Sequence, residues 1–485
     1  MTKMMTTTAA LLMTLVAMAE EQVAPKMEVD FAQTKGPMKK AIHSSGWGAV
    51  SNPRAIQNDD EVVKSMNLEY ARIHDWALVN GGQRVVDYQY VFPLIDKDAK
   101  DPSNYYFEAT DHLLDLTRKL GIKIFYRLGT SIEHTGDVHF NATVPKDFDK
   151  VAEIFAATVR HYNRGWANGH KWDIKYWEIW NEPDGIANMW CLPEKEGGKD
   201  EKLMRQKFVK FFVTCLKRLK DEFGDSIKVG GPALCYWNPV YFGELLDACK
   251  QAGVSPDFLS WHGYNQWADS LIIDAEKARK FCDERGFKKT ELILNEYHYL
   301  VTWDGIHGQN STPEMVKKAV NGPTGINGID SACFYLEILS CAQGAPLDQA
   351  YYYGCGMQGN WGYRDMYKQF NKPYYAAVLY GKLLKEFPMF SGVVHAGSKV
   401  GTLNALAAKS ADGKRKALLV TDYRSRVKRL AIDVKGVPAD ARVSATLLDD
   451  THNNAPCAVV FKDGKIVVDK PDELSFSMLV VFEEI

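Results

Sequence analysis

Short apolar segments alternate with longer amphipathic segments from about residue 41 to residue 387. The short segments are rich in β-branched residues, as buried strands are, while the longer ones repeat their apolar positions with helical spacing. The predicted strands are residues 41–48, 68–75, 122–128, 174–180, 227–231, 258–262, 291–297 and 348–354. The predicted helices are residues 105–120, 146–163, 201–223, 239–252, 271–284, 326–342 and 372–387. This alternation is typical of an α/β fold with a parallel sheet. Eight such strands favour a closed (β/α)8 TIM barrel, with a doubly wound sheet as the alternative.

The pattern changes after residue 387, where short alternating strands follow one another with polar turns between them. These strands are predicted at residues 417–423, 430–434, 443–448, 458–461, 465–468 and 475–482. Asp463-Gly464 is a typical hairpin turn within this series. Residues 388–485 are therefore predicted to form a small C-terminal β-sandwich domain. The extension at residues 20–40 contains a β-rich stretch, 23–31, which could add a strand to that domain.

The first 19 residues have the pattern of a secretory signal peptide. Lys3 supplies a positive charge, residues 9–16 are apolar, and Ala17-Met18-Ala19 forms a small-residue cleavage site. The apolar run is too short to cross a bilayer, which takes about 20 residues, and no later segment is long enough. We expect cleavage after Ala19, a secreted or periplasmic protein and no membrane span; an uncleaved anchor is the alternative.

Charge and composition narrow the range of partners. The chain has 59 basic and 61 acidic residues, so it lacks the excess of positive charge typical of nucleic-acid-binding proteins. Its 12 Trp and 23 Tyr suit a ligand with flat apolar faces such as a sugar, although core packing explains most of them. The nine cysteines are odd in number, and none forms a Cys-x-x-Cys pair. They predict neither a disulfide framework nor a zinc site, and no cofactor is expected; one or two disulfides remain possible.

The strongest chemical motif lies where the predicted strand 174–180 enters a loop. Residues 177–184 read Trp-Glu-Ile-Trp-Asn-Glu-Pro-Asp. The active sites of (β/α)8 barrels lie at the C-terminal ends of the strands, so Glu182 stands where a catalytic carboxylate is expected. Asn181 can hold a substrate hydroxyl, and Pro183 stiffens the turn. A surface charge on a loop is the alternative for Glu182.

A second apolar strand also ends in a carboxylate. Residues 292–298 read Leu-Ile-Leu-Asn-Glu-Tyr-His, which places Glu296 at a strand end, 114 residues (296 minus 182) after Glu182. Two carboxyl groups on one barrel rim are what glycoside hydrolysis requires, one as the acid for the leaving oxygen and one as the anion at the anomeric carbon. We therefore expect Glu182 and Glu296 to form a catalytic pair. Their tasks require different pKa values.

These motifs resemble those of clan A glycoside hydrolases and, within that clan, of family 39, which contains β-xylosidases and α-L-iduronidases. Residues 180–183 are similar to the acid/base motif of the clan, and 295–297 to its nucleophile strand. The resemblance therefore implies that Glu182 is the acid/base and Glu296 the nucleophile. Residues 70–75 resemble the Arg-x-His strand of the family, and 260–264 its His-x-Tyr strand. The chain departs from the family pattern at Asn295, where Thr is common, and at residues 351–353, where a Trp usually occurs. These departures concern the sugar and not the reaction class.

The resemblance also implies roles for residues around the pair. It implies that Arg72 supports the nucleophile and that His74 contacts the sugar, although a buried ion pair would also explain Arg72. His262 and Tyr264 could contact the sugar or orient Glu296, and a core histidine is the alternative for His262. Five tryptophans lie in predicted rim loops, and one or two of them are expected to stack on sugar: Trp76, Trp237, Trp267, Trp303 and Trp361.

Three functions remain open on the sequence alone. The first is a secreted retaining hydrolase of O-glycosidic bonds that acts from the ends of oligosaccharides or polysaccharides. The second is a clan A endo-glycanase or arabinofuranosidase, and the third is a carbohydrate-binding homologue without catalysis. The presence of both glutamates argues against the third. Arg364 could bind the carboxylate of a uronic acid, but its position in a loop favours an ordinary surface arginine.

Overall fold

The computed structural model describes most of the chain. The described residues are 26–46, 60–74, 85–130, 143–185, 190–198, 200–306, 311–353, 361–364, 369–398, 401–425, 427–470 and 474–484. The expected signal peptide, residues 1–19, lies outside them, as do Trp76 and Cys355. None of the described helices is long and apolar enough to cross a membrane.

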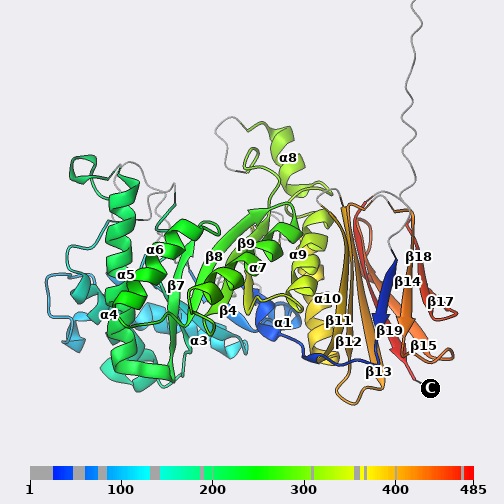
Figure 1. The fold of residues 1–485 in the computed structure, drawn as a ribbon, viewed down its shortest axis with the longest axis horizontal. Helices are drawn as coiled ribbons and strands as arrows, with labels where there is room; N and C mark the ends of the chain where they lie inside the picture. Colours follow the sequence, from blue (N-terminus) through cyan, green and yellow to red (C-terminus); the bar gives the residue numbers. More distant parts are fainter. Residues whose placement is uncertain are drawn as a thin grey trace, which may run out of the picture.

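Eight parallel strands close into a barrel, with the last strand paired to the first. In barrel order they are β3 (Ser44–Ser45), β4 (Tyr70–Ile73), β5 (Lys123–Leu128), β6 (Tyr176–Ile179), β7 (Lys228–Leu234), β8 (Phe258–Asn265), β9 (Glu291–Tyr299) and β10 (Gln349–Tyr352). Each lies within or overlaps a predicted strand. Strands β4, β7, β8 and β9 of this barrel are labelled in Figure 1. The closure confirms the (β/α)8 barrel and excludes the doubly wound sheet. Large side chains fill the centre: Phe125, Tyr176, Phe258, Ile293 and Tyr351 pack together there.

The helices predicted around the barrel are all present. They are α3 (Glu108–Lys119), α4 (Phe148–Arg164), α5 (Glu201–Phe223), α6 (Pro239–Gln251), α7 (Ala268–Glu284), α9 (Ile329–Ala342) and α10 (Lys372–Glu386). Side-chain caps fix several of their starts: Asp147 accepts a hydrogen bond from the Lys150 amide, and Asn238 from that of Tyr241.

Several shorter helices were not predicted. They are α1 (Asp60–Ser65), α2 (Tyr88–Val91), α8 (Pro313–Asn321) and the 3-10 turns η1 (Lys40–Ile42), η2 (Pro102–Asn104), η3 (Trp166–Asn168), η4 (Glu194–Glu196) and η5 (Gly224–Ser226). Helix α8 projects from the body of the molecule (Figure 1).

Two sheets form the C-terminal β region. The first has seven strands in the order β16 (Asn453–Cys457), β15 (Arg442–Leu448), β19 (Phe476–Glu483), β13 (Arg415–Tyr423), β12 (Gly401–Lys409), β11 (Met389–Ser398) and β2 (Gly36–Pro37). The second has four, in the order β1 (Met27–Asp30), β14 (Arg429–Lys435), β18 (Lys465–Asp469) and β17 (Val460–Lys462). Buried side chains from both sheets form one core between them, as a sandwich requires.

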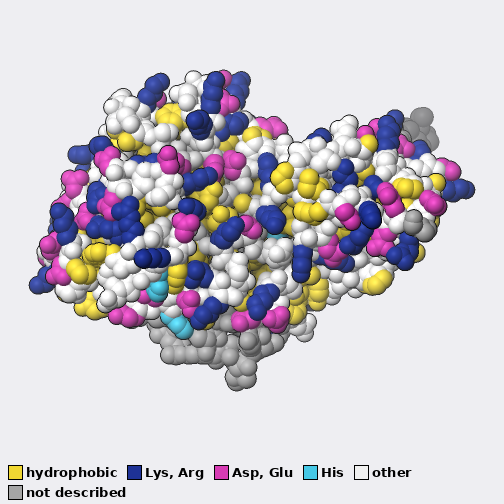
Figure 2. Space-filling view, turned by 90° about the horizontal axis from the view of Figure 1, so that it is seen from below, with side chains coloured by type: hydrophobic (Ala, Val, Ile, Leu, Met, Phe, Trp, Pro, Cys, Tyr) yellow, Lys and Arg dark blue, Asp and Glu magenta, His cyan; other side chains and the backbone are white. Residues whose placement is uncertain are grey.

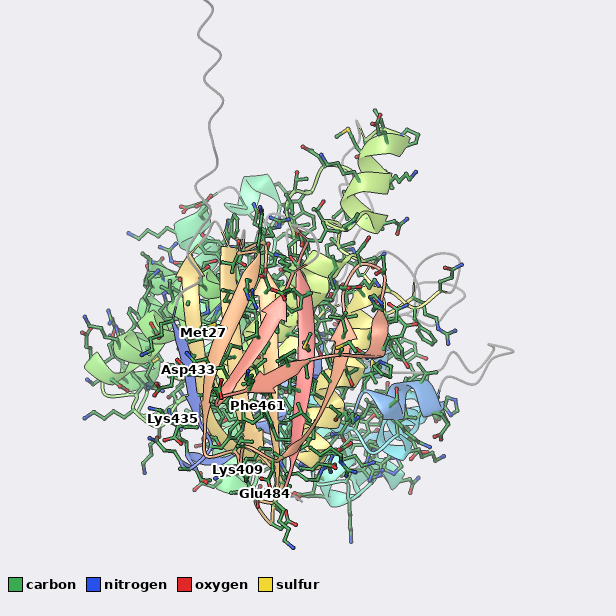
Figure 3. All side chains as sticks on the ribbon, turned by 90° about the vertical axis from the view of Figure 1, so that its right-hand side faces the viewer. Met27, Lys409, Asp433, Lys435, Phe461 and Glu484 are labelled. Atoms are coloured by element: carbon green, nitrogen blue, oxygen red, sulfur yellow. The ribbon has the colours of Figure 1, made fainter. Side chains whose placement is uncertain are left out.

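The N-terminal extension takes part in both sheets. In β1, Met27 pairs with Ile432 of β14, so the first described strand joins the C-terminal region (Figure 3). This agrees with the strand expected from residues 23–31. The sequence did not predict β11, β12 or β16. The Gly-Thr-Leu-Asn-Ala-Leu-Ala-Ala-Lys sequence of β12 contains three alanines, which have low strand propensity.

Helix α9 connects the barrel to the seven-stranded sheet (Figure 1). Nearly all of its residues are buried, because it packs on β9 on one side and on β12 and β13 on the other. Its polar side chains bond across this contact: Asp330 accepts a hydrogen bond from Ser475 (2.5 Å), and Glu337 accepts one from Thr402 (2.7 Å). The β region is thus attached to the barrel by buried contacts.

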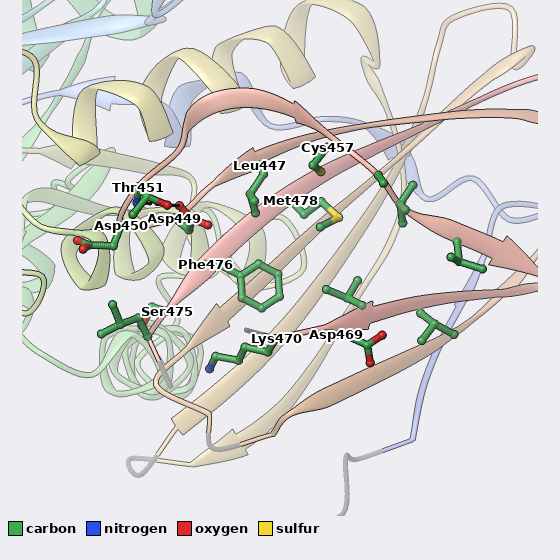
Figure 4. A pocket seen from close by; sticks show the side chains of 16 residues that line it. Leu447, Asp449, Asp450, Thr451, Cys457, Asp469, Lys470, Ser475, Phe476 and Met478 are labelled. Atoms are coloured by element: carbon green, nitrogen blue, oxygen red, sulfur yellow. Dashed lines mark hydrogen bonds between the residues drawn. The ribbon is translucent and has the colours of Figure 1, made fainter. Parts of the chain in front are cut away.

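A cavity of about 380 Å³ opens between the two sheets of the β region (Figure 4). Leu447, Phe476 and Met478 contribute apolar surface to it, while Asp449, Asp469 and Lys470 add charged groups. All of its lining residues come from positions 447–478, so the barrel contributes nothing to it.

The surface charges are mixed in sign, as the nearly equal numbers of basic and acidic residues lead one to expect. On the face shown in Figure 2, acidic and basic side chains are intermingled, and no concentrated basic area appears there. Among the described residues, the cysteines at positions 215, 235, 249, 282, 333, 341 and 457 are free.

Candidate active site

The loop after β6 places Glu182 at the C-terminal end of the barrel. The backbone here is unusual: Trp180 has φ 76° and Glu182 has φ 44°, values that non-glycine residues rarely adopt. Backbone hydrogen bonds hold these conformations, from the Trp180 amide to the Leu128 carbonyl (2.6 Å) and from the Glu182 amide to the Ala233 carbonyl (2.9 Å). Such backbone strain persists where the surroundings fix it, and it is frequent at active sites.

The Glu182 side chain points at His262 on β8. A hydrogen bond of 2.8 Å joins Glu182 Oε1 to His262 Nδ1. Burial raises the pKa of Glu182, against smaller lowering effects of the Cys235 thiol and the Arg72 charge. Burial lowers the pKa of His262 to about 4, so its ring is neutral near neutral pH. The neighbourhood therefore favours a protonated Glu182, as a general acid requires.

Glu296 lies on β9 and is only 2% exposed. Its Oε1 accepts a hydrogen bond of 2.6 Å from the Tyr264 hydroxyl, and its Oε2 accepts one of 3.1 Å from Arg72 Nη1. Burial raises the pKa of Glu296, while the Arg72 charge and the Tyr264 hydrogen bond oppose that effect. Both contacts stabilise the carboxylate form, which a nucleophile requires.

The two carboxyl groups face each other with His262 between them. One oxygen of Glu182, one of Glu296 and one ring nitrogen of His262 all lie within 4.8 Å of one another. His262 Nδ1 is 3.6 Å from Glu296 Oε1. Carboxyl groups about 5–5.5 Å apart are typical of retaining glycosidases, whereas inverting enzymes separate theirs by about 6.5–9.5 Å. At least one oxygen of each carboxyl group thus lies within 4.8 Å of an oxygen of the other, which favours the short class.

Arg72 on β4 is fully buried and organises the site. Its Nε donates to Glu178 Oε2 (2.7 Å), its Nη2 to Asn181 Oδ1 (2.7 Å), and its Nη1 to Glu296. Arg72 forms the buried ion pair that was the alternative for it. It also contacts Glu296, whose support by Arg72 as a nucleophile stays a prediction. With its oxygen bound by Arg72, Asn181 keeps an amide nitrogen that bonds no described residue, a donor suited to a substrate hydroxyl.

Glu178 is a residue that the sequence analysis missed. It lies on β6, fully buried, and it also accepts hydrogen bonds from Ser260 (2.6 Å) and from Asn295 (2.7 Å). Asn295 therefore helps to hold Glu178 in place. It occupies the position where the family pattern often has Thr. The sequence offered one signal for Glu178, its position in the middle of a buried strand, because a buried carboxylate needs partners.

His74 follows β4 and is buried beside a second ion pair. Its Nδ1 accepts a hydrogen bond of 3.2 Å from Arg127 Nε, and Arg127 Nη2 bonds Asp87 Oδ1 at 2.7 Å. Neither Arg127 nor Asp87 was identified from the sequence. The ion pair holds the His74 ring in place at the strand end, two residues after Arg72, and a sugar contact there remains a prediction.

Aromatic rings line the Glu296 side of the site. Trp361 lies with its ring 5.8 Å from that of Tyr264 and 5.9 Å from that of Trp303, centroid to centroid. Trp303 is 49% exposed, so its ring can receive a ligand. The other two described rim tryptophans pack within the protein: Trp237 against Trp261 and Phe281, and Trp267 against Tyr423.

Arg364 is not the surface residue that its loop position favoured. It is 2% exposed, and its guanidinium lies 4.4 Å from the centre of the Phe370 ring. The backbones of the same two residues also form an isolated antiparallel β-bridge.

The site contains the ligand atoms for a cation, but its charges are already balanced in part. Glu182, His262 and Glu296 could together hold a metal ion by their spacing. Arg72, however, lies 3.1 Å from Glu296 and supplies positive charge there. The arrangement is better suited to acid–base and nucleophilic chemistry than to holding an ion.

A closed (β/α)8 barrel with two facing carboxyl groups at its strand ends defines the barrel-type glycoside hydrolases. Comparison with known proteins identifies the family. The family model described as "Glycosyl hydrolases family 39" matches residues 25–310, and the chain belongs to that family. This agrees with the resemblance of its motifs.

Curated relatives match over shorter stretches. A β-xylosidase of Geobacillus stearothermophilus is 26% identical over 187 residues, which are 37% of this chain and 34% of the relative. A β-xylosidase of Caldicellulosiruptor saccharolyticus is 26% identical over 210 residues, 41% of this chain and 37% of the relative. The aligned part thus spans little more than a third of either relative.

Solved structures share the fold over nearly the whole chain. A glucosidase from Croceicoccus marinus superimposes with a TM-score of 0.70 at 19% identity, covering 96% of this chain and 100% of the other. A GH30 endoxylanase from Clostridium papyrosolvens gives a TM-score of 0.58 at 12% identity, with 95% and 100% covered. These likenesses extend through the β region as well as the barrel.

Proposed function

We propose that this protein hydrolyses O-glycosidic bonds with net retention, with Glu182 as the acid/base and Glu296 as the nucleophile. The proximity of their carboxyl groups carries the proposal, because groups this close are typical of enzymes in which one carboxylate attacks the sugar directly. Glu296 attacks the anomeric carbon while Glu182 protonates the leaving oxygen. Water, deprotonated by Glu182, then displaces Glu296 from the covalent intermediate.

The surrounding residues have roles that follow from their contacts. Arg72 and Tyr264 each bond one oxygen of Glu296, which orients the nucleophile and stabilises its ionised form against the effect of burial. The free amide nitrogen of Asn181 binds a sugar hydroxyl. Trp303 and Trp361 offer a platform for the sugar on the Glu296 side.

A β-xyloside is the first substrate to test, since the curated relatives are β-xylosidases. We propose that the enzyme removes terminal sugars from oligosaccharides. An endo-glycanase or an arabinofuranosidase remains the alternative, and the fold is shared with an endoxylanase. Nitrophenyl β-xyloside, β-glucoside and α-L-arabinofuranoside separate the sugars. End-reduced xylo-oligosaccharides distinguish release of single sugars from internal cleavage.

Proton NMR of the first-formed product tests the mechanism directly. With an aryl β-glycoside that the enzyme accepts, the β anomer of the free sugar should appear first and the α anomer only later, as the sugar mutarotates. The intervening glycosyl–Glu296 ester produces this result, because two inversions give net retention. If the α anomer appears first, Glu296 is not a nucleophile.

We also propose that the protein is exported and that its mature chain starts at Glu20. The charge at Lys3, the apolar run and the Ala17-Met18-Ala19 pattern support this. N-terminal sequencing of protein purified from its native source should begin at or near Glu20. Cytosolic protein that retains Met1 would rule the proposal out.

A further inference from the structure

A second group of metal-ligating side chains lies where the loop before β6 meets α3 and α4. Asp111 comes from α3, His161 from α4, and His170 from the loop after η3. One ligating atom of each lies within 4.8 Å of the other two. His161 Nε2 is 3.0 Å from Asp111 Oδ1, and His170 Nε2 is 3.3 Å from Asp111 Oδ2.

The hydrogen bond on the far side of the His161 ring fixes its tautomer. Nδ1 lies 2.9 Å from the Trp166 carbonyl oxygen, which can only accept, so Nδ1 carries a proton. In a neutral ring, Nε2 then presents a lone pair to the Asp111 carboxylate at 3.0 Å. Two acceptors repel at that distance unless a cation lies between them. The cation is either a second proton on the ring or a metal ion.

Distances and partners suit the metal ion. A tetrahedral zinc site has metal–ligand bonds of about 2.0–2.2 Å, which places neighbouring ligand atoms roughly 3.3–3.5 Å apart. The distance of 3.3 Å from His170 Nε2 to Asp111 Oδ2 falls in this range. His161 Nε2 approaches the other carboxylate oxygen, Oδ1, at the shorter distance of 3.0 Å, so an ion would lie between both oxygens and the two rings. His170 Nε2 is buried and has no well-aligned hydrogen bond with any described residue. A ring nitrogen that donates to a carbonyl from the side away from the ion, as in His161, is the usual arrangement of a zinc-binding histidine.

Both rings are held in place before any ion binds. The His161 ring stacks on Phe107 at 3.6 Å between centroids, and the His170 ring stacks on Trp172 at 3.9 Å. The His170 amide donates to the His161 carbonyl at 2.6 Å. Gly169 fits between them only because it lacks a side chain, since a Cβ there would lie 2.2 Å from the His161 carbonyl oxygen.

The loop that carries His170 is strained on both sides of it. Ala167, Asn168 and Asp173 have φ values of 55°, 58° and 54°, which cost energy in residues other than glycine. Strain of this kind collects at ligand clamps and functional sites. A bound ion would stabilise the loop in this conformation.

We propose that Asp111, His161 and His170 bind one divalent ion of the zinc type. The side chains of Asp111 and His170 are 25% and 31% exposed, so water can reach the ion as a fourth ligand. Two histidines with one carboxylate suit zinc and its first-row neighbours better than calcium or magnesium. The loop leads into the start of β6, at the end of the barrel opposite Glu182. The ion therefore joins α3, α4 and this loop and takes no part in hydrolysis.

Zinc titration of metal-free protein tests the proposal. Calorimetry should give one ion per chain, and Co²⁺ in its place should give the intense visible absorption of a tetrahedral complex. At a hundredfold excess over the dissociation constant, zinc should raise the melting temperature by about 2–3 °C. His170→Ala should lose both signals. His112→Ala removes an exposed histidine on α3, next to Asp111, and should keep both signals.

The candidate active site is a competing binding site in this experiment, since Glu182, His262 and Glu296 could also bind an ion. The titration is therefore repeated in Glu182→Gln, where binding must persist at one ion per chain. Binding that vanishes in Glu182→Gln, or that survives in His170→Ala, overturns the proposal. So does the absence of zinc binding, which would mean that a proton on His161 is the cation beside Asp111.

Discussion

Replacing Glu296 with Gln should lower kcat/KM on an aryl glycoside by at least about 1000-fold while leaving the fold intact. The amide cannot attack the anomeric carbon, so the covalent step is lost, and several kcal/mol of transition-state stabilisation go with it. Glutamine is chosen because Glu296 is buried and bonded to Arg72. Alanine would leave a hole beside that guanidinium. Steady-state rates and thermal melting monitored by circular dichroism measure the two properties separately.

The matched control is Glu291→Gln on the same strand. Glu291 begins β9, at the opposite end of the barrel from Glu296, and accepts a hydrogen bond of 2.9 Å from the Tyr176 hydroxyl. Its loss should affect stability slightly and activity hardly at all. A second variant, Glu296→Ala, opens space for azide, which should form the glycosyl azide of inverted anomeric configuration. Activity within about tenfold of wild type in Glu296→Gln would contradict the assignment of the nucleophile.

Much of the fold was predictable because the barrel strands are buried on both sides and their helices are amphipathic. Helix α5, residues 201–223, was predicted with its observed bounds. Strands β11 and β12 were missed for a local reason, since glycine and alanine occupy many of their positions. The pairing of β1 with β14 joins residues some 400 positions apart, and the sequence could suggest only that a strand was available.

The residues of the site likewise fall into those that the sequence identified and those that it did not. Glu182 and Glu296 were identifiable because each stands at the end of a strand in a recognisable motif. Glu178 was hidden, because its meaning depends on Arg72, 106 residues earlier in the chain. The pair Arg127 and Asp87 was hidden for the same reason. Single sequences reveal residue types and local spacing, whereas the partner of a buried charge is set by the packing of distant strands.

The Glu182 variant should lose activity in a way that depends on the leaving group. In Glu182→Ala, glycosides with poor leaving groups should react at least about 100-fold more slowly, because nothing protonates the departing oxygen. Nitrophenyl leaving groups need little protonation, so Glu296 should still be glycosylated rapidly and the intermediate should accumulate. Mass spectrometry of the stopped reaction detects it as an added sugar mass. Added azide should speed turnover and give a glycosyl azide with the anomeric configuration of the substrate.

The pH profile provides the second measurement for Glu182. Burial raises the pKa of Glu182, and the enzyme needs this group protonated in the first step. Wild-type kcat/KM should therefore fall as pH rises through that pKa, and it should fall again at low pH as Glu296 becomes protonated. Glu182→Ala should lose only the decline at high pH. Asp184, whose pKa burial raises to about 6, is the neighbour most easily mistaken for the acid. Asp184→Asn should keep both declines, and a profile that instead loses its high-pH decline in Asp184→Asn would transfer the acid role away from Glu182.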